Sequence, residues 1–154
     1  YTKNDRIYRY LRDVVLSSSQ YKQIMESMMA DAGYFAHKYF ENLFMNEKEV
    51  LDLANRSHCI GLHSHSHPTM IQDLDILEQK QEYIQNLKIL NSILNIELKA
   101  MSHPCGRYNT QTLQVLRKLG VKTGFRSSMS KIRNQSTLEI PRNDHMNVLR
   151  AATL

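Results

Sequence analysis

Three histidines stand within five residues of one another, at His63, His65 and His67. Neutral imidazole is a good ligand for zinc and other divalent transition metals. If the chain makes a helical turn here, His63 and His67 lie on one face and His65 points elsewhere. If the segment stays extended, all three side chains share one face and can chelate an ion together. Both geometries predict a divalent-metal site. The alternative is a histidine-rich loop that binds metal only adventitiously or not at all.

A catalytic metal site usually needs a further protein ligand. A carboxylate often completes two histidines, and one position stays open for water. Asp5, Asp13 and Asp31 lie in segments with helical spacing, where we expect them to be solvated. Asp144 is better placed because it follows a predicted strand, although it lies late in the chain. The residues alone leave the third ligand unassigned.

The chain around these histidines alternates between helical and strand-like patterns. We expect helices over residues 5–16, 20–32, 47–56, 73–94 and 110–119, and a short helix from Asn143. We expect short buried strands over residues 58–63, 98–101, 121–125 and 138–141. Strands that alternate with helices of this length favour parallel βαβ units. The expected class is α/β, either an open parallel sheet or part of a barrel.

Local signals indicate where several helices begin and end. The run Ser17, Ser18 and Ser19 can cap the second helix, Asn46 can cap the third, and Gly33 and Gly120 are expected helix stops. The spacing of apolar residues predicts which side chains face inward in three helices: Ile7, Tyr10, Leu11 and Val14 in the first, Tyr21, Ile24, Met25, Met28 and Met29 in the second, and Leu74, Leu77, Ile84, Leu87 and Leu94 in the fourth.

Chemistry-bearing side chains gather just past the predicted strands. The His63–His67 segment follows the first strand, His103 and Cys105 follow the second, and Arg142 and His145 follow the fourth. In parallel α/β folds, ligands bind at the carboxyl ends of the strands. We therefore expect a functional site at this edge of the sheet.

Composition limits the class of protein. With 154 residues, the chain suits a single domain over residues 1–154 that rests on apolar packing. Its two cysteines are too few for a disulfide framework and are expected to be free thiols. No run of 18 apolar residues occurs, so we expect no membrane span. The net charge of +5 is compatible with an acidic partner, but no nucleic-acid-binding motif is present, so we expect no nucleic acid.

Residues 60–68 (IGLHSHSHP) resemble the second motif of the NodB-homology polysaccharide deacetylases, carbohydrate esterase family four, which reads His-Ser/Thr-x-x-His-Pro. Residues 102–109 (SHPCGRYN) are similar to the third motif of a branch that writes it Pro-x-Gly-x-Tyr-Asn. Residues 138–142 (LEIPR) resemble a late strand of the same branch that ends in Pro-Arg. The likeness covers residues 44–145, and its motifs are specific in combination. It implies a partial or distorted (β/α) barrel with parallel strands of the NodB-homology type.

The resemblance also implies roles for individual residues. His63 and His67 would bind a divalent metal, most often zinc in this family, and Ser64 would support the loop. The backbone N–H of Cys105 would donate to the oxyanion. Arg142 would hold a carboxylate near the metal, and His145 would be the general acid. The alternatives are a buried space-filling side chain for Cys105 and surface side chains for Arg142 and His145.

The chain departs from the family pattern at two places. The family opens with Thr-Phe-Asp-Asp-Gly, whose aspartates supply a general base and a metal ligand, and nothing like it occurs here. We expect that motif before Tyr1, which is not a Met, so this chain would lack the N-terminal strand of the domain. Ser102 stands where the third motif usually has Arg, a charge that Arg142 would supply instead.

The resemblance predicts a metal-dependent hydrolase that removes N-acetyl groups from a sugar in a polysaccharide or glycan precursor. A non-catalytic glycan- or metal-binding domain that keeps the fold is the alternative. A third candidate is an interaction domain whose basic surface binds an acidic polymer. Because four strands cannot close a barrel, we expect further strands or a partner, such as a second copy in a homo-oligomer, to cover the exposed edges.

Overall fold

The computed structural model describes residues 1–35, 38–39, 43–133, 135–143 and 145–152. It forms two compact units, Tyr1–Asn46 and Glu47–Leu154. The expectation of one deacetylase-like domain over residues 1–154 stays a prediction. No helix in the described part of the chain is both long and apolar enough to cross a membrane.

The first unit is a pair of helical segments with well-formed caps. It contains α1 (Lys3–Tyr10), a π-helical turn (Leu11–Val15) and α2 (Ser18–Asp31). The Ser17 hydroxyl accepts from the Gln20 amide, and the Gln20 side chain accepts from the Ser17 amide, so the predicted cap is confirmed. Gly33 follows α2 with φ 69°, as expected of a helix stop.

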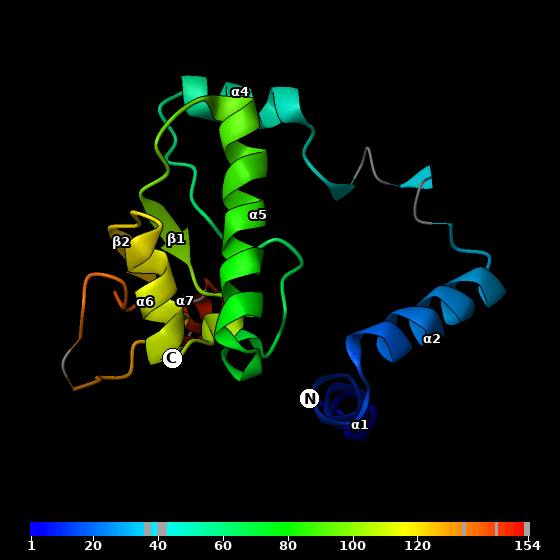
Figure 1. Cartoon of the computed structure of the whole chain (residues 1–154). Coiled ribbons are helices and arrows are strands. Elements are labelled where there is room, and N and C mark those ends of the chain that lie inside the picture. Colours follow the sequence, from blue (N-terminus) through cyan, green and yellow to red (C-terminus); the bar gives the residue numbers. More distant parts are fainter. Residues whose placement is uncertain (36–37, 40–42, 134, 144, 153–154) are drawn as a thin grey trace. The chain divides into compact units, whose positions relative to one another are not determined.

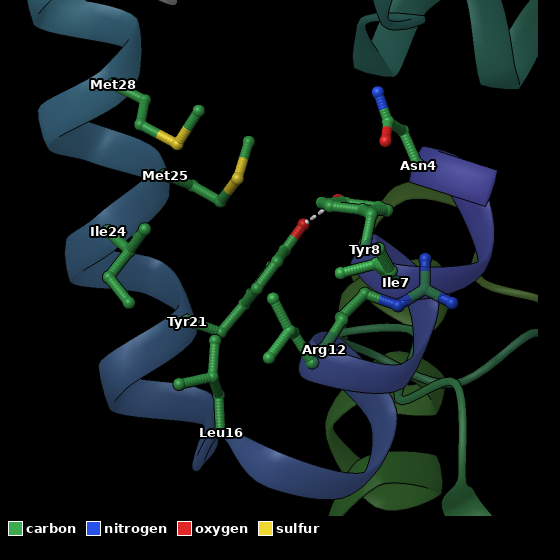
Figure 2. A pocket seen from close by; sticks show the side chains of 10 residues that line it. Asn4, Ile7, Tyr8, Arg12, Leu16, Tyr21, Ile24, Met25 and Met28 are labelled. Carbon is green, nitrogen blue, oxygen red and sulfur yellow. Dashed lines mark hydrogen bonds between the residues drawn. The ribbon is translucent and has the colours of Figure 1, made fainter.

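An apolar hollow lies between the helices of this unit (Figure 2). Its volume is about 560 Å³, and the Tyr8 and Tyr21 hydroxyls are 2.6 Å apart within it. The apolar residues expected to face inward are not buried here: Ile7 is 47% exposed and Met28 59% exposed. Six of the predicted inward-facing residues do line the hollow, so their orientation is confirmed: Ile7, Leu11, Tyr21, Ile24, Met25 and Met28. They are not buried because two helices alone form no second layer that would remove their apolar faces from water.

The second unit carries the strands. It consists of α4 (Glu47–Asn55), a 3₁₀ turn (Ile71–Asp73), α5 (Ile76–Leu94), β1 (Ala100–Ser102), a 3₁₀ turn (Pro104–Gly106), α6 (Thr110–Lys118), β2 (Thr123–Phe125) and α7 (His145–Ala152). Capping explains the bounds of α5: the Asp75 carboxylate accepts from the amides of Leu77 and Glu78, and left-handed Asn95 ends the helix. Gly120, with φ 85°, follows α6 as predicted.

Four chain segments run parallel and side by side. β1 pairs with β2 in the register Ala100↔Thr123, Met101↔Gly124 and Ser102↔Phe125. Leu62 forms a parallel bridge to Met101 on one side, and Ile140 forms one to Phe125 on the other. The expected strands 58–63 and 138–141 are therefore single bridges rather than strands, because only one residue of each segment, Leu62 or Ile140, pairs with the neighbouring strand. The parallel α/β arrangement is confirmed, and the described residues do not form a closed barrel.

One core joins these segments to the helices. α5 and α6 pack against each other beside β1 and β2 (Figure 1). The buried apolar residues are Leu62, Ile71, Tyr83, Leu94, Leu98, Met101, Leu113, Val115, Leu116, Val121 and Leu138. This core covers one side of β1 and fixes the ends of the parallel segments, where the histidines follow.

The predicted inward face of the fourth helix is confirmed at Leu94, which is buried, and at Leu74 and Leu87, which pack against the core. It is wrong at one position. Leu77, expected to face inward, is 72% exposed, whereas Gln79 is fully buried. The Gln79 amide nitrogen donates to the Leu74 carbonyl at 2.9 Å, and its oxygen accepts from the Thr112 hydroxyl at 2.6 Å. Because both ends of its amide are hydrogen-bonded, this polar side chain can occupy a core position. The spacing of apolar residues did not predict this position as buried.

A candidate metal centre at the ends of the parallel segments

A hollow of about 560 Å³ opens along the sheet in the second unit. Residues of the parallel segments line it, together with one arginine. They are Cys59, Gly61, Leu62 and His63, then Ala100, Met101 and Ser102, then Thr123, Phe125 and Arg142. The structure thus brings His63 and Arg142 to one hollow, as the predicted strand-end positions require.

The His63 ring is oriented by the backbone of the neighbouring strand. Its Nδ1 lies 2.7 Å from the carbonyl oxygen of Ser102. Because a carbonyl oxygen can only accept, Nδ1 carries the proton and donates this bond. The lone pair of the neutral ring is then on Nε2. Metal-binding histidines use this same arrangement, in which the second ring nitrogen is anchored to a carbonyl or carboxylate.

His67 lies beside His63. Their ring centroids are 4.8 Å apart with planes inclined at 55°. The chain between them is neither a helical turn nor extended, because Ser64 and His67 have φ values of 66° and 56° and residues 65–66 form a bend. His63 therefore pairs with His67, as the first of the two predicted geometries required. The pair forms through a bend and not through the helical turn which that geometry assumed.

Two residues of α5 that the sequence analysis did not single out hold this loop. The Glu82 carboxylate accepts from the amides of His65 and Ser66 and from the Ser66 hydroxyl. The Asn86 side-chain oxygen accepts from the His63 amide. Their spacing of four residues, on the helix that follows the histidine loop, was a signal available in the sequence.

The other predicted site residues lie at the same strand ends but outside the hollow. Cys105 has φ 51° and is exposed, so the alternative of a buried space-filling side chain is wrong. The neighbouring Gly106 and Arg107 amides donate to His103 and Pro104, whereas the Cys105 amide has no backbone acceptor in the described part of the chain. His145 begins α7 and is exposed. Neither residue is among the described residues that line the hollow.

Arg142 is exposed and follows the segment that pairs with β2. Its Nε donates to the Arg126 carbonyl at 3.4 Å. The guanidinium therefore has donors left for an acidic group at the hollow, which is what the predicted role requires.

His103 is buried, and its Nε2 donates to the Leu138 carbonyl at 2.8 Å. Its ring stacks on Tyr108, with centroids 4.3 Å apart. Burial lowers the pKa of His103, and the hydrogen bond to Leu138 opposes this shift only in part. His103 is thus a neutral core histidine that ties β1 to the segment around Leu138.

This lowered pKa predicts a pH dependence of stability. The unfolded chain binds a proton at the usual histidine pKa of about 6.5, above the folded value, so the free energy of unfolding should fall as pH drops below about 6.5. Replacing His103 with Gln should flatten that fall. Urea unfolding between pH 7.5 and pH 5.5 measures it, with His58→Gln, at an exposed histidine, as the control. An equally steep fall in the His103→Gln variant would contradict the assignment.

The third ligand is not found among the described residues, in which no group of three or more His, Cys, Asp or Glu side chains is arranged for a metal ion. Asp5, in the capping box of α1, and Asp31 are exposed, as expected, whereas Asp13 is partly buried and pairs with Arg12. Asp144 lies outside the described residues. The two histidines fit half of a tetrahedral donor set, with His63 pre-oriented through Nδ1.

The polysaccharide deacetylase family model matches residues 18–124. The chain belongs to the polysaccharide deacetylase family. This confirms the family predicted from the histidine and Pro-Cys-Gly motifs, while the branch with the Pro-x-Gly-x-Tyr-Asn motif stays a prediction. No curated protein matches the sequence.

Solved deacetylase structures share the fold. The Streptococcus pyogenes deacetylase PplD, solved in complex with acetate, is 22% identical with a TM-score of 0.59, over 69% of this chain and 50% of that one. IcaB from Ammonifex degensii is 15% identical with a TM-score of 0.59, over 71% and 52%. The BpsB deacetylase domain from Bordetella bronchiseptica is 14% identical with a TM-score of 0.56, over 65% and 48%. The chain thus spans about half the length of these structures.

Proposed function

We propose that this protein is a metal-dependent hydrolase that removes N-acetyl groups from a sugar in a polysaccharide or glycan precursor. The observation that carries the proposal is the His63–His67 pair. Its rings lie side by side at the end of a parallel segment, and the Ser102 carbonyl leaves Nε2 of His63 free to bind a metal. Membership of the polysaccharide deacetylase family supports the reaction class.

His63 and His67 would hold a divalent ion, with zinc as the first candidate. Such an ion would supply Lewis-acid chemistry, activating water as the nucleophile and polarising the acetyl carbonyl. A carboxylate would accept the proton of the attacking water. Arg142, at the same hollow as His63, would hold that carboxylate in place.

The remaining roles concern the tetrahedral intermediate. The Cys105 amide, which has no backbone acceptor among the described residues, would donate to the oxyanion. His145 would give its proton to the nitrogen as the carbon–nitrogen bond breaks. The products are acetate and the free amino sugar, so the water supplies one oxygen and the atoms balance.

Acetate release tests this function. The complete protein, stripped of metal with a chelator, should release little acetate from oligomers of N-acetylglucosamine, and adding zinc should restore release. The alternative, a non-catalytic glycan- or metal-binding domain, differs in outcome. It would bind the oligomer or zinc and release no acetate at any metal concentration. Release that is unaffected by chelation would contradict the metal dependence.

A further inference from the structure

The carboxylate of Glu82 is devoted to the backbone of the histidine loop. Oε2 accepts from the His65 amide at 2.9 Å and from the Ser66 amide at 2.8 Å, and Oε1 accepts from the Ser66 hydroxyl at 2.7 Å. Hydrogen bonds to an ionised carboxylate are stronger than those between neutral groups. Because both oxygens are engaged in this way, Glu82 is placed to order the loop rather than to bind a ligand itself.

Asn86 adds a fourth connection from the same helix. Its side-chain oxygen accepts from the His63 amide at 3.0 Å. Residues four apart lie on one face of a helix, so Glu82 and Asn86 present their acceptors side by side. His63 is thereby held twice: its backbone by Asn86 and its ring by the Ser102 carbonyl at 2.7 Å.

The helix that carries these acceptors is itself firmly placed. α5 is capped by Asp75 and buries Gln79, Tyr83 and Leu94 in the core of the second unit. Glu82 adjoins Tyr83, a fully buried residue of that face. The loop is therefore tied to a rigid element of the fold, as accurate metal ligation requires.

The loop needs such support because of its backbone. Ser64 and His67 both have left-handed φ values, 66° and 56°, which are unfavourable for residues other than glycine. Such conformations persist only where the surroundings determine them, and they often occur at functional sites. The three amides held from α5, those of His63, His65 and Ser66, flank Ser64 and precede His67.

We propose that Glu82 and Asn86 are positioning residues that hold the His63 and His67 rings in the geometry that binds a divalent transition-metal ion. This inference rests on the proposed function, because it takes the histidine pair as the metal site. It predicts that metal affinity depends on two side chains that do not touch the metal.

Zinc affinity of the 154-residue chain, measured by competition with a chromophoric chelator, tests the proposal. Glu82→Ala and Asn86→Ala should each weaken zinc binding by roughly 10–100-fold, the usual effect of losing a partner that orients a ligand. Glu82→Gln keeps an oxygen that accepts from the two amides, so it should restore most of the affinity. Gln81→Ala and Asn91→Ala, at exposed positions on α5, are the matched controls and should bind like the parent.

A second measurement separates positioning from loss of the fold and from failure of the proposed function. In Glu82→Ala, the His65 and Ser66 amides should lose hydrogen-exchange protection while far-ultraviolet circular dichroism keeps the helical signal of α5. Parent-like zinc affinity in Glu82→Ala, with binding lost in His63→Ala, would overturn the positioning role alone. The exchange measurement does not depend on zinc, so unchanged exchange at the His65 and Ser66 amides in Glu82→Ala would overturn the ordering of the loop even if the parent chain bound no zinc.

Discussion

Replacing either His63 or His67 with Ala should abolish metal-dependent acetate release by the complete protein. Each substitution removes one of two adjacent imidazoles, whose ring centroids are 4.8 Å apart. Losing even a group that only orients a ligand costs roughly 10–100-fold in metal affinity, so losing the ligand itself should cost more. Bound metal, measured by mass spectrometry on the purified protein, and acetate release should fall together.

His65→Ala is the matched control for this experiment. It removes the same kind of side chain from the same loop, and it leaves intact the His65 amide that donates to Glu82. We expect metal content and acetate release close to those of the parent. Equal losses in all three single variants would indicate adventitious binding to a histidine-rich loop. Unchanged acetate release in His63→Ala would remove this residue from the site.

Replacing Gly106 with Ala should destabilise the turn that presents the Cys105 amide. Gly106 has φ 67°, and an added Cβ would overlap the Ser127 hydroxyl. The left-handed backbone costs about 1–2 kcal/mol and the overpacking about 1–3 kcal/mol, so the loss of unfolding free energy should be at least about 2 kcal/mol. Urea unfolding measures it, and in the complete protein a displaced amide should lower kcat by roughly 100-fold or more.

Two further variants separate the backbone cost of Gly106→Ala from the cost of its overlap with Ser127. Gly120→Ala places a side chain at φ 85° with no other atom within 4 Å, so it should show the backbone cost alone. Adding Ser127→Gly to Gly106→Ala removes the side-chain overlap and should recover part of the stability. If Gly106→Ala proves no more destabilising than Gly120→Ala, the close contact with Ser127 does not constrain this turn.

Local signals predicted the helices well because capping acts within one turn. The bounds of α2 follow from Ser17, and the end of α6 follows from Gly120, each through hydrogen bonds or backbone conformations of neighbouring residues. Pairing and burial depend on distant residues, and these expectations were less accurate. Residues 58–63 form one bridge at Leu62 rather than a strand, and Leu77 is exposed where Gln79 is buried.

In the candidate site, too, the local motifs were predicted and the contacts between distant residues were not. Histidine spacing and the Pro-Cys-Gly turn were enough to predict the polysaccharide deacetylase family, which the match over residues 18–124 confirms. These motifs did not reveal Glu82 and Asn86. Two polar residues four apart on a helix usually face solvent, so their spacing alone does not indicate that a loop packs against them. The hydrogen bonds to the His63, His65 and Ser66 amides are what distinguish these two residues.

The sequence by itself determined the family, the parallel α/β class and the histidines that come to one edge of the sheet, because motif identity and period are local properties of the chain. Only the tertiary structure decided that His63 pairs with His67, that the Ser102 carbonyl orients the His63 ring, and that α5 holds the loop. The contacts with Ser102 and with α5 join residues 16 to 39 positions apart, and only folding brings them together.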